Sequence, residues 1–239
     1  MRLGEEPGGS GDDPFDAIAD GVRGAEPAQV PQRLCQVAAR VLPVSGASVS
    51  LCGDRMPVPL SASDPRAAYL MEIQATLGDG PCLYAARTGA PVLAPDLTSG
   101  PDAHRWPVYA QQATEAGVRA VYALPLGTGS RCLGTLDLYR DVPGELGVRE
   151  LHTAQVVAKV MTVALTELPL REENGGPWLG ELAADHDEVY QATGMIMAQL
   201  GVGADEALAR LRAHAFARGS TVATAAHDVV TNRRRFDEL

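Results

Sequence analysis

Residues 118–139 read VRAVYALPLGTGSRCLGTLDLY and carry the clearest fold signal in the chain. Two runs within them, Val118–Leu126 and Leu133–Tyr139, are dominated by apolar and β-branched residues, as in strands that pack on a core. The segment between them contains GTGS at 127–130, whose residue types favour tight turns. The stretch therefore predicts two strands joined by a short turn.

The segments on either side of these strands predict an α+β domain. Shorter strands are expected over 47–51 and 91–94. The run GDGP at 78–81 and the segment from 95 through Asp102 are expected to be loops. Apolar residues at helical spacing predict helices over 32–42, 66–77, 109–116 and 148–168. Helices at both ends of a mostly antiparallel sheet are typical of a sensor domain.

Composition divides the chain into two parts, with a tail in front and a linker between. Residues 1–13, MRLGEEPGGSGDD, have almost nothing to bury and are predicted to be disordered. Residues 171–177, REENGGP, combine charges with Gly and Pro, which is typical of a linker. The expected units are a domain over 14–170 and a helical module over 178–239.

The helix expected over 148–168 has two apolar stripes. One repeats at helical spacing through Leu151, Ala154, Ala158, Met161, Leu165 and Leu168. The other consists of Val156, Val160 and Val163 on another flank. One stripe covers the sheet of its own domain, and the second needs a partner. We expect a homodimer contact there; the alternative is a helix buried on two sides within one subunit.

The chain is acidic, but its charge is unevenly spread. It has 30 Asp and Glu against 20 Lys and Arg, a net charge of −10. The first 26 residues hold seven acids against two arginines, whereas residues 189–235 hold six arginines against three acids. Net acidity opposes nonspecific coating of nucleic acid. Any nucleic-acid affinity of the C-terminal part should therefore depend on shape and loop bases.

Cysteine spacing and hydropathy limit the remaining classes of protein. Cys35, Cys52, Cys82 and Cys132 have neither zinc-ligand spacing nor the density of a disulfide framework, so we expect reduced thiols in the cytoplasm. No apolar run approaches the ~18–20 residues of a membrane span, so no membrane association is expected. Recognisable nucleotide-binding, metal and nucleophile motifs are absent, so we expect no catalytic residues, no metal, no cofactor and no enzyme activity.

The C-terminal module has the pattern of three helices. The first carries a heptad-like core through Val189, Thr193, Ile196 and Leu200 and ends at Gly201. The second begins near Ala204 and buries Ala207, Leu208, Leu211 and Ala215. The third begins after Ser220 or Thr221 and is expected to end in the arginines at 233–235. On the second helix, Arg210 and His214 lie on one border of the apolar stripe and Arg212 on the other.

This module resembles an ANTAR domain. The residues that carry the resemblance are QATGMIMAQLGV at 191–202, DEA at 205–207 and LRAHA at 211–215. The resemblance implies a three-helix RNA-binding module that acts in transcription antitermination, usually as a dimer, on paired stem-loops of leader RNA. The family often has lysine where this chain has Thr193. The expected RNA-binding residues are Gln191, Thr193, Gly194, Met197, Arg210, Arg212, His214 and Arg218.

The preceding domain resembles a GAF domain. The resemblance rests on GDGPC at 78–82, TGAPV at 88–92, DL at 96–97, RWP at 105–107, GVRA at 117–120 and LGTLDLY at 133–139. It implies a six-stranded sheet with helices on one side and a pocket for an unidentified small molecule. Cys82, Trp106 and Tyr139 are the candidate pocket residues. The alternatives are that Cys82 is a buried small apolar residue and that Trp106 pins a loop.

Together these features predict a cytoplasmic regulator in which the front domain controls an RNA-binding dimer. RNA polymerase would be affected only indirectly, through the RNA. The alternative is a small-molecule sensor whose helical module binds DNA or only another protein. The module lacks a clear tight turn leading into an exposed recognition helix, which disfavours DNA binding.

Overall fold

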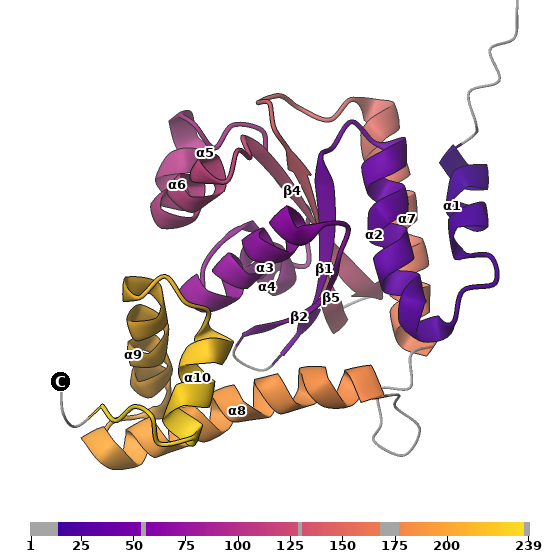
Figure 1. Cartoon of the computed structure of the whole chain (residues 1–239). Helices are drawn as coiled ribbons and strands as arrows, with labels where there is room; N and C mark the ends of the chain where they lie inside the picture. Colours follow the sequence, from indigo (N-terminus) through magenta and orange to yellow (C-terminus); the bar gives the residue numbers. More distant parts are fainter. Residues whose placement is uncertain (1–13, 54–55, 129–130, 168–176, 237–239) are drawn as a thin grey trace, which may run out of the picture.

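The computed structural model describes residues 14–53, 56–128, 131–167 and 177–236, and some side chains at the ends of these ranges are not described. The tail expected at 1–13 and nearly all of the linker expected at 171–177 lie outside the described residues. Figure 1 shows a central sheet, helices packed around it, and a helical unit at one end.

The sheet has five strands in the part of the chain that the structure describes, against the six that the resemblance implied. Its order is β2 (Pro57–Ala62), β1 (Gly46–Cys52), β5 (Arg131–Arg140), β4 (Ala120–Thr128) and β3 (Val92–Ala94). All neighbours are antiparallel. The strands predicted from 118–139 are β4 and β5, which pair along most of their length with Val121 opposite Tyr139.

Helices cover both faces of the sheet, whereas the resemblance implied helices on one side. α1 (Pro14–Val22), α2 (Val30–Val41) and α7 (Val148–Glu167) pack on one face, and the 3₁₀ helix η1 (Pro27–Gln29) leads into α2. α3 (Pro65–Leu77), α4 (Pro81–Thr88), α5 (Gly100–Arg105) and α6 (Pro107–Glu115) lie on the other. The physical reason is strand alternation: Tyr122 and Leu124 of β4 enter one cluster, and Val121 and Ala123 enter the other.

Five of the described elements were not predicted from the sequence: α1, η1, β2, α4 and α5. β2 contains Pro57 and Pro59, which argue against a central strand, but β2 is an edge strand and tolerates them. α4 begins directly after the expected loop because Pro81 occupies the first turn of the helix, where its missing N–H costs nothing. α5 is only six residues long and lies where a loop was expected.

The second stripe of α7 is largely covered within the subunit. Val156 and Val160 are partly buried and pack against the same cluster as Met161 and Leu165. Val163 is 56% exposed. Burial on two sides within one subunit therefore accounts for two of the three valines, and the dimer contact stays a prediction.

The C-terminal part forms the three predicted helices, α8 (Pro177–Leu200), α9 (Ala204–Ala217) and α10 (Val222–Val230). α8 ends before Gly201, which has a left-handed φ of 65°. The four residues predicted to be buried on α9 are all buried. The expectation that the last helix runs to 235 was wrong, because Asn232 adopts a left-handed φ of 56° and the helix ends at Val230.

The helical module packs against the sensor domain at what we call the joint, formed on the sensor side by Met56, Ala75, Thr76 and Gly78. Met56 and Ala75 are buried in the cluster that also contains the core residues of α8, α9 and α10. The backbone N–H of Val222 donates a hydrogen bond of 3.1 Å to Thr76 Oγ1. The sensor domain thus caps the first turn of α10 and contributes to the core of the module.

Candidate nucleic-acid interface and sensor pocket

A buried polar cluster lies between the sheet and the helices α3 and α4. Gln74 Nε2 donates a 2.8 Å hydrogen bond to Asp137 Oδ2, and Gln74 Oε1 accepts one of 2.9 Å from the backbone N–H of Cys82. Gln74 and Asp137 are both fully buried. Gly80, with φ of +142°, makes this possible, because a Cβ there would lie 2.6 Å from Gln74 Oε1.

Burial raises the pKa of Asp137 to about 7, and the hydrogen bonds from Gln74 and Tyr139 only partly oppose this effect. Asp137 Oδ1 and the Tyr109 hydroxyl have no hydrogen-bond partner among the described residues. Nearby, Tyr139 and Ser48 share a hydroxyl hydrogen bond of 2.7 Å. The cluster therefore holds a carboxyl group that changes charge near neutral pH and has unused hydrogen-bonding capacity.

The three pocket residues expected from the sequence are all buried, at 2% exposure for Cys82, 3% for Trp106 and 1% for Tyr139. Cys82 lines a cavity of about 230 Å³, but Trp106 and Tyr139 are not among the residues that line it. Trp106 instead packs beside Tyr84, with the Arg105 guanidinium 4.8 Å from its ring. Burial raises the pKa of the Cys82 thiol.

Sequence reasoning did not single out Gln74 or Asp137. Strand alternation contains the signal, since it places Thr135, Asp137 and Tyr139 on one face of β5 and Leu136 and Leu138 on the other. A carboxylate in the middle of a strand that is buried on both faces needs a partner, and Gln74 supplies it.

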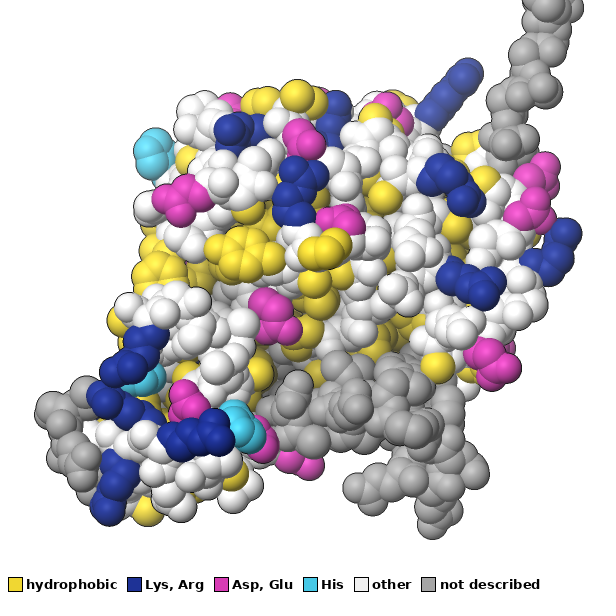
Figure 2. Space-filling view, in the orientation of Figure 1, with side chains coloured by type: hydrophobic (Ala, Val, Ile, Leu, Met, Phe, Trp, Pro, Cys, Tyr) yellow, Lys and Arg dark blue, Asp and Glu magenta, His cyan; other side chains and the backbone are white. Residues whose placement is uncertain are grey.

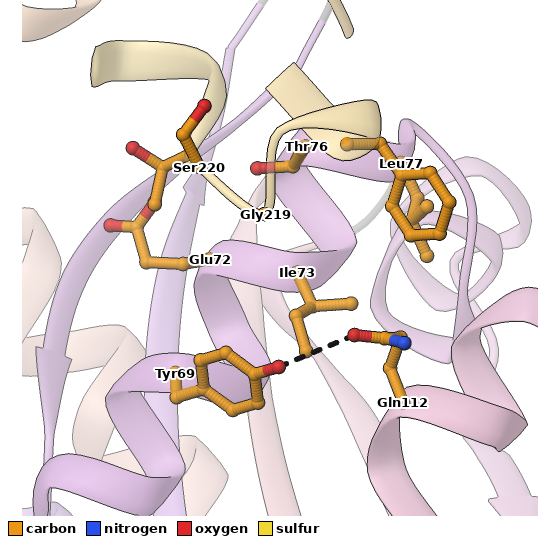
Figure 3. Close-up of a pocket in the computed structure, with 10 residues that line it drawn as sticks. Tyr69, Glu72, Ile73, Thr76, Leu77, Gln112, Gly219 and Ser220 are labelled. Atoms are coloured by element: carbon orange, nitrogen blue, oxygen red, sulfur yellow. Dashed lines mark hydrogen bonds between the residues drawn. The ribbon is translucent and has the colours of Figure 1, made fainter. Parts of the chain in front are cut away.

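A groove of about 240 Å³ lies beside the joint, between the sensor domain and the module (Figure 3). Tyr69, Ile73 and Thr76 of α3 form its floor, together with Gln112 of α6. The turn between α9 and α10, at 219–221, forms the opposite wall. On the floor of the groove, the Tyr69 hydroxyl donates a 3.3 Å hydrogen bond to Gln112 Oε1. A shift of the module relative to the sensor domain would therefore change the shape of this groove.

Several residues expected to bind RNA are exposed on the module. Gln191, Gly194 and Met197 are exposed on α8. Arg210 and Arg218 are exposed at α9, and Arg210 pairs with Glu206 one turn away at 2.7 Å. Such an exposed pair contributes little to stability, so Arg210 is available for a phosphate.

Thr193 and Arg212 lie in different surroundings. Thr193 is 5% exposed, and its hydroxyl donates a 2.7 Å hydrogen bond to the Val189 carbonyl within α8. The Arg212 guanidinium lies against Gly78 of the sensor domain, where a Cβ would overlap it. Burial lowers the pKa of Arg212. The structure therefore does not bring these two residues onto the exposed face that carries Arg210.

His214 belongs to a positively charged group at the end of the module. Burial lowers its pKa, and the charges of Arg218 and Arg234 lower it further, against an opposing effect of Asp228. Its ring centroid lies 5.1 Å from that of Phe236. Figure 2 shows Arg and His side chains gathered over this part of the molecule, at the lower left. The patch is a concentration of positive charge on an acidic protein.

Within the described residues, no group of three or more His, Cys, Asp or Glu side chains could hold a metal ion. None of the described helices combines the length and the hydropathy that crossing a membrane requires.

The fold is an α+β domain followed by a small module of three helices. A family model for the GAF domain matches residues 26–165, and one for the ANTAR domain matches residues 179–230. The chain belongs to the GAF family, in the form in which an ANTAR domain follows the GAF domain. This confirms both resemblances drawn from the sequence.

Among solved structures, two examples match part of this chain. Free methionine-R-sulfoxide reductase from Neisseria meningitidis, in complex with its substrate, is 15% identical, with 64% of this chain and 86% of that chain covered and a TM-score of 0.48. The GAF domain of a phosphoenolpyruvate-protein phosphotransferase from Coxiella burnetii is 14% identical, with coverages of 64% and 90% and a TM-score of 0.49. No curated protein matches this chain.

Proposed function

We propose that this protein is an RNA-binding transcription antitermination regulator, whose GAF domain controls how an ANTAR dimer is presented to paired stem-loops in nascent RNA. The observation that carries the proposal is the ANTAR match over 179–230, on a module that folds into three helices with exposed arginines. The protein acts by holding RNA in one structure, so RNA polymerase is affected indirectly and no covalent chemistry is involved.

The proposed RNA face consists of exposed residues of α8 and α9 together with the partly buried His214. Arg210 and Arg218 follow the phosphate backbone, since guanidinium groups supply forked donors to phosphate oxygens, and the His214 imidazole lies beside them as a further donor. Gln191, Gly194 and Met197 contact loop nucleotides from α8, where unstacked bases expose their edges and faces. The net charge of −10 keeps nonspecific affinity low, so recognition depends on the shape and loop bases of the RNA.

The proposed means by which the GAF domain controls RNA binding is a change in how the module packs against it at the joint. Arg212 lies in the joint, against Gly78, and is therefore withheld from RNA in this arrangement. A small molecule bound to the GAF domain near the buried Asp137 would change this packing, because Gln74 and Thr76 belong to the same helix. Release of the joint would expose Arg212 as a second RNA contact, on the border of α9 opposite Arg210.

The test is a gel-shift experiment with a two-stem-loop leader RNA, a scrambled hairpin and duplex DNA, at several salt concentrations. We expect the leader RNA to bind most tightly. Equal binding to all three nucleic acids would contradict antitermination, and preference for the duplex would favour the DNA-binding alternative. Binding to none of them would favour a module that contacts only protein.

Replacement of Arg210 and Arg218 by Ala should weaken binding to leader RNA and lower its salt dependence. Each lost phosphate contact reduces the slope of log K against log salt by roughly one. Arg40→Ala is the matched control, since Arg40 is an exposed arginine on α2, outside the module. An unchanged slope in the double variant would remove these residues from the RNA face.

We also propose that the protein is a homodimer with Val163 at the contact, because this exposed valine continues the second stripe of α7. Val163→Glu should shift sedimentation of the full chain toward the monomer, since burial of an unpaired carboxylate is costly. Gln155→Glu, at an exposed position of α7 outside that stripe, should leave it unchanged. Equal behaviour of the two variants would place the contact elsewhere.

A further inference from the structure

Two thiol groups meet at one end of the sheet. Cys52 is the last residue of β1, and Cys132 lies near the start of β5. Their Sγ atoms are 2.7 Å apart, and both cysteines are free. This separation is only about 0.7 Å longer than the ~2.05 Å of a disulfide bond, so little movement separates the dithiol from the disulfide.

Gly134 accounts for this close approach. It pairs with Leu51 across the β1–β5 ladder, and a Cβ at this position would overlap the Ser50 carbonyl oxygen. Without a side chain at Gly134, the backbones of the two strands come close just before Cys52. Cys132 Sγ also donates a 3.3 Å hydrogen bond to the Gly134 carbonyl when its thiol is protonated.

The surroundings leave Cys52 open to small reactants, and Cys132 beside it is partly exposed. Cys52 is exposed and lines the cavity of about 230 Å³, together with Met56, Cys82 and Arg87. A hydrogen bond from Cys52 lowers the pKa of Cys132 to about 7, while the same interaction raises the pKa of Cys52. The pair therefore holds one thiolate and one thiol near neutral pH. A thiolate is the form of cysteine that reacts with oxidants.

We propose that Cys52 and Cys132 form an oxidisable dithiol site, which hydrogen peroxide converts into an intramolecular disulfide. The Cys132 sulfur attacks one peroxide oxygen, the O–O bond breaks, and the other oxygen leaves as water after it takes up a proton. The product is a sulfenic acid on Cys132. The Cys52 sulfur then attacks the Cys132 sulfur, and the S–O bond breaks. The hydroxyl leaves as water with the Cys52 proton, so two sulfurs lose two electrons to the peroxide.

The disulfide would act on the joint because Cys52 lies four residues before Met56, which is buried in the core of the helical module. A bond from Cys52 to Cys132 of β5 would fix the end of β1 close to this position. We expect oxidation to slow amide hydrogen exchange in residues 189–196, which contribute Val189, Ala192 and Ile196 to the cluster that contains Met56.

The experiment uses the full chain, fully reduced and then treated with hydrogen peroxide. We expect an intact mass lower by two hydrogen atoms and a cross-linked peptide that joins Cys52 to Cys132. Cys52→Ser and Cys132→Ser should each abolish the cross-link. Cys82→Ser is the matched control, because Cys82 lines the same cavity but should not be needed.

Three outcomes would overturn the proposal. They are four free thiols after treatment, a cross-link that contains Cys82, and a stable sulfinic acid on Cys132 without any cross-link. Unchanged hydrogen exchange over 189–196 after the cross-link has formed would overturn its effect on the joint. Neither measurement involves RNA, so the result is independent of the proposed antitermination function.

Discussion

Asp137 links the stability of the sensor domain to pH, because its carboxyl group is fully buried against Gln74. Its pKa is about 7 in the folded protein and 3.8 when unperturbed, so the folded state holds the proton more tightly. Stability contributed by the protonated group is therefore fully present below about pH 4 and is lost as the pH rises to about 7 and above. One proton gives a slope of at most about 1.4 kcal/mol per pH unit.

Asp137→Asn should flatten this fall in the free energy of unfolding, since an amide cannot lose the proton. The measurement is urea unfolding across the same pH window for both proteins. Asp96→Asn is the control, because hydrogen bonds from Thr98 and Ser99 lower the pKa of this exposed carboxylate, which places its titration below the window. An equal slope in the Asp137 variant and the natural protein would show that Asp137 is not the titrating group.

Two arginines of α9 show which features of single residues can be predicted from the sequence. Helical periodicity places Arg210 and Arg212 on opposite borders of the apolar stripe of α9, and the structure agrees. Periodicity says which residues share a border, but it does not say what covers that border. The burial of Arg212 against Gly78 depends on a contact between residues far apart in the chain, and no local pattern encodes it.

Among the elements, the turn from α3 to α4 supports the buried polar cluster. Gly80→Ala should destabilise the protein by roughly 1–3 kcal/mol through backbone strain at φ of +142°, and further through displacement of Gln74. Gly89→Ala is the matched control, with a φ of +65° and no atom within 4 Å of an added Cβ. Thermal unfolding should show a larger loss for Gly80→Ala. Equal losses would mean that the contact with Gln74 adds nothing.

Long helices and strands were predicted from the sequence more accurately than short ones. The long α7 was predicted to within one residue, and the strands β4 and β5 to within two residues at each end, because many residues repeat one period. α1, β2, α4 and α5 were missed because they are only six to nine residues long, and in such short segments tertiary position decides the structure. The buried cluster was missed because its partners, Gln74 of α3 and Asp137 of β5, lie far apart in the chain.

At the scale of the whole molecule, the joint makes the stability of the module, and its position, depend on the sensor domain. Thr76→Val should leave the buried N–H of Val222 without an acceptor, at a cost of about 1–3 kcal/mol. Hydrogen exchange at the start of α10 should become faster. Thr166→Val, at an exposed position of α7 where the hydroxyl bonds within the helix, should leave that exchange unchanged. Unchanged exchange in Thr76→Val would show that α10 does not need this cap.

The core shared across the joint also bears on how such regulators evolve. Met56 and Ala75 belong to the sensor domain, yet they are buried with Ala192, Ile196 and Leu211 of the module. A lineage that exchanged one ANTAR module for another would inherit a poor fit at these positions. Substitutions at 56 and 75 should therefore be accompanied by compensating substitutions in the helices of the module. The sensor domain and the module would then evolve together.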